Sequence, residues 1–506
     1  MEKQEISVDS LLIVIDKLKD ENEQLRQQNQ WLIEQIRLSK HRQFGASSEQ
    51  TAVNGGEQTS LFNEAEQCAD LTALEPLITE VKAYRRKRTR LTTDKLPEDL
   101  PVETLLYTIS DEDRICPDCG SEMHKMGENC REELVLIPAT AKIRRHLTYV
   151  YSCRHCERHA ESVPIIEAEL PEPVIKGGMA SPEAIAHIAT QKFVMGSPLY
   201  RQEQEWNSQG ILLSRQTMSN WLMKACEDWL KPIYEEMKRQ LCAFDVLHAD
   251  ETTLQVLHED EKSAKSKSYM WLYRTSGDSK RHIVLYDYQK SRGRENPKRF
   301  LKDFSGFLHA DGYDAYHALP NGITVVGCWA HLRRKFDEAM KSLPKDRQRP
   351  SSASDGIDFC DKLFLFEKQF AKITPEERFK ERQRVSLPLM EEFFAWADSL
   401  NVLPQCLLGK AVTYSQNQRK YLKNFLLDGR LELSNNRAER SIKPFVIGRK
   451  NWLFANTKKG ATASAIYYSL IMTAKENGLN PFEYLARVFS QAPNGAKTTH
   501  LLPWKP

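Results

Sequence analysis

Apolar residues near the start of the chain follow a seven-residue period, which predicts a coiled coil. Leucines recur at Leu11, Leu18, Leu25 and Leu32. With leucine at the d positions, β-branched residues and two asparagines occupy the a positions, which favours a parallel two-stranded coiled coil over residues 1–45. A lone amphipathic helix packed on its own protein is the alternative. The coiled coil predicts a homodimer or higher oligomer, or pairing with a different partner protein.

This periodicity disappears after the first 45 residues, and charge becomes the main feature. Residues 51–80 contain six acids and no lysine or arginine. We therefore expect residues 46–100 to be a flexible linker. Within it, residues 82–90 contain six basic side chains, a density that suits contacts with DNA phosphates. A solvated charged tail is the alternative. The candidate phosphate contacts are Arg85, Arg86, Lys87 and Arg88.

Three helix-start signals follow one another between residues 175 and 235. Ser181 and Ser197 each precede a proline, a pair typical of a helix N-terminus. Ser214 caps a third predicted helix, with apolar residues along one face and polar residues on the other. The pattern favours a helix-turn-helix that enters the DNA major groove, although a generic three-helix linker would give the same signals. The candidate DNA contacts are Arg215, Gln216, Ser219 and Asn220.

From residue 240 the pattern changes to short strands rich in β-branched and aromatic residues. The order is three strands, a short helix, a fourth strand, a fifth strand and a basic helix. The respective ranges are 244–257, 268–275, 282–288, 295–303, 306–310, 323–327 and 329–340. This is the order of a ribonuclease-H-like sheet, so residues 240–340 are expected to form the first part of an α/β catalytic core.

Charged helical segments then interrupt the core. Residues 341–430 are expected to be a helical insertion, followed by a last catalytic helix at 431–455 and a helical C-terminal region at 456–506. The predicted fold class is a multidomain α+β protein.

Three acidic residues lie where this fold would bring them together. Asp250 is in the middle of the first predicted strand, Asp311 follows the fourth, and Glu439 begins the last catalytic helix. Three carboxylates can hold two hard cations about 3.5–4 Å apart, the arrangement for in-line phosphoryl transfer. Strand alternation places Glu251 on the opposite face from Asp250, so the two acids cannot easily join one metal site. Asp250 is the expected ligand because of its place in the motif.

Each of these acids also has a structural interpretation. Asp250 fits a surface acid on a strand, and Asp311 fits a turn residue before Gly312. Asn436 and Glu439 have the spacing of a capping box, in which Glu439 would only satisfy the start of its helix. The occurrence of all three acids in the expected order favours the catalytic interpretation.

Four of the eleven cysteines form two Cys-x-x-Cys pairs. In an intracellular protein such pairs indicate a closed four-thiolate site for one structural Zn²⁺ ion. The 33 residues between the pairs fit a zinc ribbon over residues 101–165, in which strands separate the two knuckles. Two unrelated turns that contain cysteine are the alternative. The predicted ligands are Cys116, Cys119, Cys153 and Cys156.

Composition adds little beyond these motifs. The 506 residues are 41% hydrophobic and 28% charged, which is ordinary for a soluble protein. No apolar run approaches the ~20 residues that span a bilayer, so we expect a cytoplasmic protein without a membrane partner.

The order of these motifs resembles the IS66-type transposases, which are DDE transposases. The resemblance covers nearly the whole chain, from the leucine repeat to the core. Its core motifs are Asp250-Glu251-Thr252, Asp311-Gly312-Tyr313-x-x-Tyr316, Cys328-Trp329-Ala330-His331-x-Arg333-Arg334 and Asn435-Asn436-x-Ala438-Glu439-Arg440. The resemblance implies that Asp250, Asp311 and Glu439 bind two Mg²⁺ ions, or Mn²⁺. It also implies accessory proteins from the same mobile element.

A protein of this kind would cut DNA at the ends of an insertion sequence and join them to target DNA. Basic residues beside the acids could hold the scissile phosphates, although a solvated basic helix is the alternative. These residues are His331, Arg333, Arg334, Arg437 and Arg440. Two other classes remain open: a ribonuclease-H-like nuclease or resolvase that cuts without joining, and a non-catalytic DNA-binding regulator.

Overall fold

The computed structural model describes residues 141–152 and 165–504, together with six positions between residues 17 and 36. Those six positions are helical. The chain divides into two compact units, Ser48–Tyr149 and the remainder, and all elements below belong to the remainder. The four predicted zinc ligands and the basic run at 82–90 lie outside the described residues. Within them, no helix combines the length and apolar character needed to cross a membrane.

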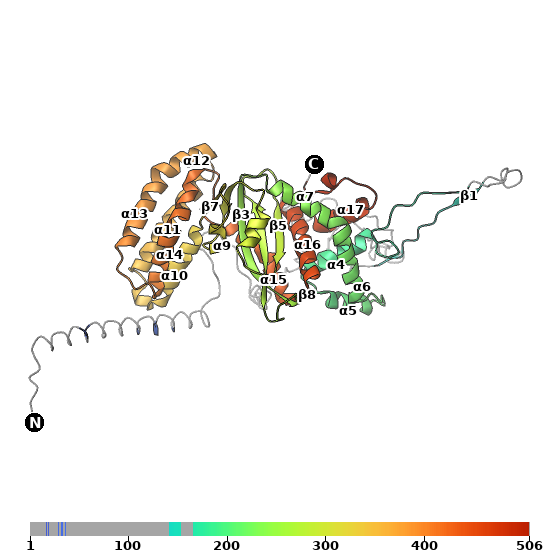
Figure 1. Cartoon of the computed structure of the whole chain (residues 1–506), viewed down its shortest axis with the longest axis horizontal. Helices are drawn as coiled ribbons and strands as arrows, with labels where there is room; N and C mark the ends of the chain where they lie inside the picture. Colours follow the sequence, from blue (N-terminus) through green and yellow to red (C-terminus); the bar gives the residue numbers. More distant parts are fainter. Residues whose placement is uncertain are drawn as a thin grey trace, which may run out of the picture. The chain divides into compact units, whose positions relative to one another are not determined.

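A mixed β-sheet lies at the centre of the described fold (Figure 1). Strand β3 (Val246–His258) pairs antiparallel with β4 (Lys267–Thr275), which pairs antiparallel with β5 (Val284–Gln289). On its other side β3 pairs in parallel with β6 (Gly306–His309), and β6 pairs in parallel with β7 (Ile323–Val326). The strand order is therefore β5-β4-β3-β6-β7. All five predicted strands are confirmed.

Two long helices cover the sheet beside β3 and β5. Helix α15 (Asn436–Trp452) lies along β3, and α16 (Lys458–Glu476) lies along β5. The Val284 N–H donates to Thr473 Oγ1 (3.0 Å) and the Tyr286 N–H to Ser469 Oγ (2.8 Å). Hydroxyl groups of α16 thus satisfy the outer edge of β5, which would otherwise expose unpaired backbone groups. Between the two helices, β8 (Ala455–Thr457) pairs with the end of β3.

The three predicted helix starts before the sheet give three helices, with one correction. Ser181 caps α4 (Pro182–Phe193) and Ser214 caps α6 (Arg215–Ala225), each through its side-chain oxygen. Helix α5 (Leu199–Ser208) has Pro198 at its N-cap and no side-chain cap, so the prediction that Ser197 caps this helix is wrong. The proline ring fixes φ near the value needed where an extended chain enters a helix, so no serine cap is required here.

The remaining helices complete the two sides of the sheet. Helix α7 (Lys231–Leu241) continues α6 through a π-helical turn, and α17 (Pro481–Gln491) packs on α4. Two short helices, α8 (Glu295–Phe300) and α9 (Asp314–His317), flank β6 in sequence. Outside this region, β1 (Val150–Ser152) and β2 (Ile165–Glu167) form a two-stranded antiparallel ribbon.

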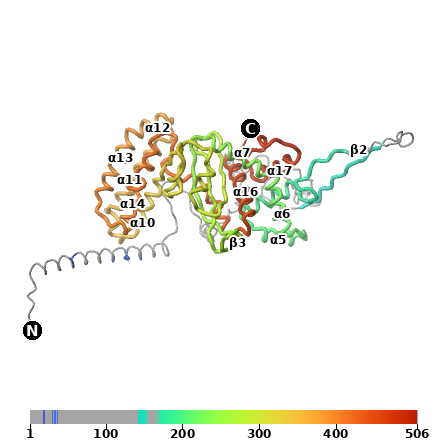
Figure 2. The backbone as a smooth tube through the Cα atoms, in the orientation of Figure 1, coloured from blue at the N-terminus to red at the C-terminus, as the bar shows by residue number. Residues whose placement is uncertain are grey.

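A second hydrophobic cluster joins the helical insertion to the helix after β7 and to the sheet, where it includes Val246 of β3 and Val326 of β7. Aromatic side chains such as Trp329, Phe336 and Phe393 fill it. Figures 1 and 2 show the helices of the insertion gathered beside the β7 side of the sheet, opposite α16 and α4. They are α11 (Ser352–Phe370), α12 (Pro375–Glu381), α13 (Leu387–Ser399) and α14 (Leu407–Lys423). Helix α10 (Trp329–Ser342), the basic helix that follows β7, packs on α11 and α14.

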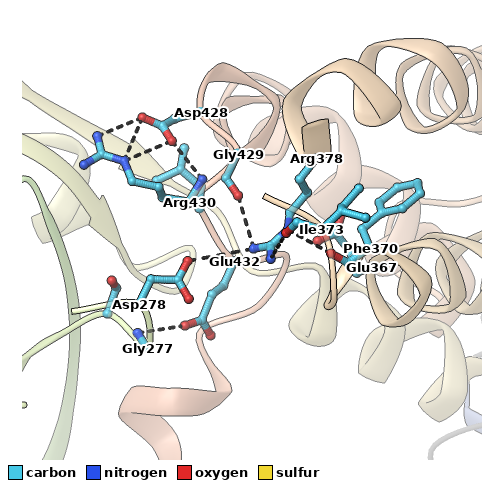
Figure 3. A network of polar contacts seen from close by, with 12 residues as sticks. Gly277, Asp278, Glu367, Phe370, Ile373, Arg378, Asp428, Gly429, Arg430 and Glu432 are labelled. Carbon is cyan, nitrogen blue, oxygen red and sulfur yellow. Dashed lines mark hydrogen bonds and ion pairs between the residues drawn. The ribbon is translucent and has the colours of Figure 1, made fainter. Parts of the chain in front are cut away.

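A network of arginines fixes the insertion to the loop that leads into α15 (Figure 3). Arg382 is fully buried and donates both to Glu367 and to backbone carbonyls of this loop, including that of Leu431 at 2.7 Å. Arg378 donates to the Gly429 carbonyl at 3.2 Å and lies 3.9 Å from Asp278, in the turn after β4. The segment that carries Glu439 is therefore fixed from the insertion side.

We expect Arg382→Leu to destabilise the protein by about 3–5 kcal/mol, because it leaves the Glu367 carboxylate and several loop carbonyls without their donor. The matched control is Arg384→Leu. Arg384 is exposed and pairs with Glu381 three residues earlier, so its loss should leave the unfolding free energy almost unchanged. Urea denaturation measures both. Equal effects would contradict this account of the network.

Candidate active site

The parallel pairing of β3 with β6 brings Asp250 and Asp311 to adjacent positions. His248 on β3 is the register partner of His309 on β6, and each acid follows two residues later. Residues two apart on a strand share a face, so both carboxylates leave the sheet on one side if the pleat continues. Asp311 lies just beyond the end of β6, where its backbone turns.

Glu439 contributes to the electrostatic environment of Asp250. Burial raises the pKa of Asp250 well above its usual value, and the charges of Glu251, Asp311 and Glu439 raise it further. Glu439 and Asp311 both also raise the pKa of His331, against the larger lowering caused by burial. Acids that are 128 residues apart in sequence (311 and 439) thus act on the same two neighbours.

Glu439 does not complete a capping box. The N-cap of α15 is Asn435 instead of Asn436, and no side-chain capping hydrogen bond forms there. The Asn435 N–H donates to Cys328 Sγ at 3.2 Å. The Glu439 carboxylate lies 3.7 Å from His331 Nε2 and 3.5 Å from Arg334. Its Oε1 atom is buried and has no hydrogen-bond partner among the described residues. The capping interpretation of Glu439 is therefore wrong, and the carboxylate is left available.

Asp311 combines a turn contact with its position in the acidic group. Its Oδ1 accepts from the Tyr313 N–H at 2.9 Å, which fixes the turn. A Cβ on Gly312 would lie 2.9 Å from the ring of Tyr414 and 3.1 Å from the amide carbon of Gln418, both on α14. Glycine is therefore needed for the insertion to approach this turn so closely.

Glu251 has two side-chain partners of its own, although burial raises its pKa and the charge of Asp311 raises it further. Tyr316 OH donates to one carboxylate oxygen (2.6 Å) and Arg292 Nε to the other (2.8 Å). The Arg292 guanidinium also stacks on Tyr313, 3.6 Å from the ring centre. Sequence reasoning did not assign a role to Arg292. The Asp-Gly-Tyr-x-x-Tyr motif marked both tyrosines, but nothing in its spacing indicated that Tyr316 contacts Glu251.

Beneath the acids lies a buried layer of polar side chains. The rings of His248 and His309 stack with centroids 4.3 Å apart, and both residues are almost fully buried. Burial lowers the pKa of His248 to about 3, so its ring is neutral. Its Nδ1 pairs with Asn435 Oδ1 (3.0 Å), while Asn435 Nδ2 donates to the Ala249 carbonyl (2.7 Å). Asn435 therefore joins α15 directly to β3, one residue before Asp250.

Among the described residues, the metal-ligating side chains whose ligand atoms lie within 4.8 Å of one another are Cys328, His331 and Glu439. The Cys328 sulfur, however, accepts the Asn435 N–H, and burial raises the pKa of this thiol to about 11. A protonated thiol with a structural contact is a poor metal ligand, because metals bind the thiolate. The carboxylates are thus the better ligands for a hard cation.

The predicted basic contacts differ in how available they are. Arg333 is bound to Asp361 on α11 (2.6 Å), and Arg437 to Glu432 (2.6 Å), so both have structural partners. Arg440 is exposed. On α6, Met218, Trp221, Leu222 and Ala225 are buried, whereas Arg215, Gln216 and Asn220 are exposed and Ser219 is half-buried.

Comparison with known proteins defines the class as a transposase. The Transposase IS66 family model matches residues 177–463. Three further models match the chain: the zinc-finger binding domain of transposase IS66 at 113–157, Transposase C of IS166 homeodomain at 31–105, and the IS66 C-terminal element at 469–504. The chain therefore belongs to the IS66 transposase family.

Similar curated proteins carry no functional name. Uncharacterized protein y4jD of Sinorhizobium fredii is 31% identical over 427 residues, 81% of this chain and 81% of that protein. Uncharacterized protein y4qI of the same organism is 28% identical over 499 residues, 93% of this chain and 87% of that protein. The zinc-finger match supports a structural zinc, and the family supports DNA as the partner.

We expect Asn435→Ala to destabilise the protein by about 2–4 kcal/mol, because it leaves the Ala249 carbonyl and the His248 ring nitrogen buried without partners. Asn436→Ala is the matched control, since this neighbouring side chain is half-buried and forms no hydrogen bond with any described residue. Its effect should stay within about 0.5 kcal/mol. Chemical denaturation measures both. An unchanged unfolding free energy for Asn435→Ala would show that the contacts of Asn435 with β3 do not hold α15 in place.

Proposed function

We propose that this protein is a DDE transposase that cuts the ends of an insertion sequence and joins them to target DNA. One observation carries the proposal: on a sheet of order β5-β4-β3-β6-β7, acids from β3, from the end of β6 and from the start of α15 act on one another electrostatically. This strand order and these positions support the prediction of a ribonuclease-H-like catalytic core. Membership of the IS66 transposase family supports the same activity.

The arrangement of the acids is unfavourable without a bound cation, and divalent cations would stabilise it. Asp250 is destabilised in its charged form by burial and by three neighbouring acids, and a Glu439 oxygen is buried without a hydrogen bond. Oxygen ligands at such a site suit Mg²⁺ or Mn²⁺. We therefore assign Asp250, Asp311 and Glu439 as the residues that would hold two such ions.

The protein's own residues supply position and charge in the proposed reaction. Bound Mg²⁺ would activate the attacking water or 3′-hydroxyl and stabilise the leaving oxygen. His331 and Arg334, which lie against Glu439, are placed to hold the scissile phosphate. The contacts of Glu251 with Arg292 and Tyr316 occupy its carboxylate, which supports Asp250 as the ligand from this strand. Cutting releases a 3′-hydroxyl, which then attacks the target phosphodiester in place of water.

The other regions are assigned to DNA binding and assembly. Helices α5 and α6 form the proposed helix-turn-helix, because α6 buries its apolar stripe and exposes Arg215, Gln216 and Asn220. Residues 1–45 are the proposed coiled coil, and the six described positions within them are helical. Two of these are the seam residues Leu32 and Ile36, which are 49% and 55% exposed in the single chain. Accessory proteins of the same element remain possible partners.

The activity test compares acid-to-amide variants with the wild type. We expect Asp250→Asn, Asp311→Asn and Glu439→Gln each to lower Mg²⁺-dependent cleavage of element-end DNA at least about 1,000-fold. DNA binding in a filter or anisotropy assay should stay within about threefold. Asp314→Asn is the matched control, because Asp314 lies three residues from Asp311 but is exposed and paired with Arg294. Identical behaviour of wild type and all four variants would favour a non-catalytic regulator.

A joining assay separates the transposase from a nuclease. Pre-cleaved end DNA and a supercoiled plasmid target are incubated with wild-type protein and Mg²⁺, and joined products are scored on a gel. Joined product that depends on Asp311 is the expected result. Hydrolysis with no joined product would instead support the nuclease or resolvase.

The zinc prediction rests on the zinc-finger match and on four cysteines outside the described residues. We expect the wild type to contain one zinc ion per chain and Cys116→Ser to lose most of it, together with thermal stability of the ribbon. Metal analysis by mass spectrometry measures this. Cys242→Ser serves as the control, because this half-buried free cysteine lies after α7 and should leave the zinc content unchanged.

A further inference from the structure

One face of α15 is exposed, basic and continuous from Glu439 to the end of the helix. At 100° per residue, Arg440, Lys443, Ile447 and Lys450 fall within one narrow stripe, and all four are exposed. The opposite face buries Ala438, Ser441, Ile442, Phe445 and Gly448 against the sheet. The stripe therefore lies on the outer side of the helix that supplies Glu439.

The positive charge of this stripe is not neutralised locally. The side chains of Arg440, Lys443 and Lys450 form no ion pair or hydrogen bond with any residue in the described part of the chain. No acid occurs between Glu439 and Glu476 in the sequence. Helix α16 then begins with Lys458 and Lys459, although basic residues at a helix N-terminus are unfavourable. An arrangement that opposes folding electrostatics is explained by a phosphate-bearing partner.

The stripe ends at an exposed apolar tip held in a strained turn. Leu453, the C-cap of α15, has φ 64° and ψ −51°, and the Phe454 N–H donates to the Trp452 carbonyl at 2.8 Å. This is a γ-turn with positive φ, which is rare for a residue with a side chain. Leu453 and Phe454 are nevertheless 64% and 42% exposed. Because both side chains are largely exposed to solvent, burial of apolar surface does not compensate for the strain of this turn.

Both flanks of the tip are fixed, which keeps the turn in place. The Trp452 ring packs edge-on against Phe445, with centroids 5.5 Å apart. On the other side, Ala455 begins β8 and pairs with Val256 of β3. Strain held by rigid surroundings at an exposed position is a mark of a functional contact.

From these observations we infer that the exposed face of α15 is the path of the DNA strand as it leaves the active site. Arg440, Lys443 and Lys450 hold its phosphates, and the Leu453–Phe454 tip contacts bases that have left the duplex stack. The inference rests on the proposed function, because it places the strand next to Glu439. From Arg440 to Leu453 the helix spans about 20 Å, or about six nucleotides at 3.4 Å each.

DNA is the occupant that these features favour. The charges suit a polyanion, and an apolar or aromatic tip between lysines suits the faces of bases, which stack on such side chains. An acidic protein segment would satisfy the lysines but would give the exposed Leu453 and Phe454 no reason to be held in a strained turn.

The phosphate part is tested by the salt dependence of DNA binding. Wild type and Lys443→Gln/Lys450→Gln are titrated against a fluorescein-labelled 30-base-pair duplex, without added Mg²⁺, at several KCl concentrations. We expect the slope of log K against log salt to fall by about 2 in magnitude, with roughly tenfold weaker binding at moderate salt. Lys372→Gln/Lys380→Gln is the matched control, because both lysines are exposed on or beside α12. Equal slopes for all three proteins would overturn the phosphate path.

The base contact is tested with the same duplex carrying a six-nucleotide 3′ single-stranded tail that contains 2-aminopurine. Leu453→Asn retains a residue that tolerates positive φ but removes the apolar side chain; Phe454→Ala removes the aromatic ring. We expect each to weaken binding of the tailed DNA about tenfold and to reduce the 2-aminopurine fluorescence change, with blunt-duplex binding altered less than threefold. Thermal stability of Leu453→Asn should match or exceed that of the wild type.

Leu365→Ala is the control for this second test, because Leu365 is 52% exposed on α11. Unchanged discrimination between tailed and blunt DNA in both tip variants would overturn the base contact. Neither experiment requires cleavage. If the variants alter DNA binding as described but the wild type never cuts DNA, the proposed function fails and the DNA path stands. If the wild type cuts DNA but the variants leave the salt slope and the discrimination unaltered, only the DNA path fails.

Discussion

The side chain and backbone of Asn435 form the joint on which the site depends. Its amide bonds to His248 and to the Ala249 carbonyl on β3, and its N–H bonds to Cys328 at the start of α10. Three segments separated by more than 70 residues in sequence therefore meet at one buried residue. Because Glu439 lies one helical turn further on, the direction in which its carboxylate points is set here.

Other contacts hold this region together against the repulsion between its acidic side chains. Three acids near Asp250 raise its pKa, so their ionised forms oppose folding at neutral pH. The buried Arg382 fixes the loop before α15, and Gly312 lets α14 approach the turn at Asp311. The insertion thus fixes the segments that carry Glu439 and Asp311 by contacts made outside the sheet. The second hydrophobic cluster joins the insertion to the sheet.

Much of the fold could be predicted because its signals are local. Five strands and the helix after them follow from alternation and from short polar breaks, and Ser181 and Ser214 cap helices as their spacing indicates. The predicted cap at Ser197 is wrong, and so is the alternative interpretation of Glu439 as a capping-box residue. Pro198 enters α5 without a serine cap, and Asn435 is held by β3 and α10 instead of by Glu439. Capping rules describe isolated helix ends, and these ends are not isolated.

The sequence by itself determined which residues carry charge, where strands and helices begin, and that the chain has the motifs of an IS66-type transposase. Tertiary structure alone decided that Arg292 and Tyr316 bind Glu251, that Arg333 and Arg437 have structural partners, and that His248 stacks on His309. It also decided that the lysines of α15 share an exposed face with a strained leucine at its end. The physical reason is the same in each case. Local sequence fixes short-range backbone preferences, whereas the partner of a side chain depends on which distant segment the packing brings beside it.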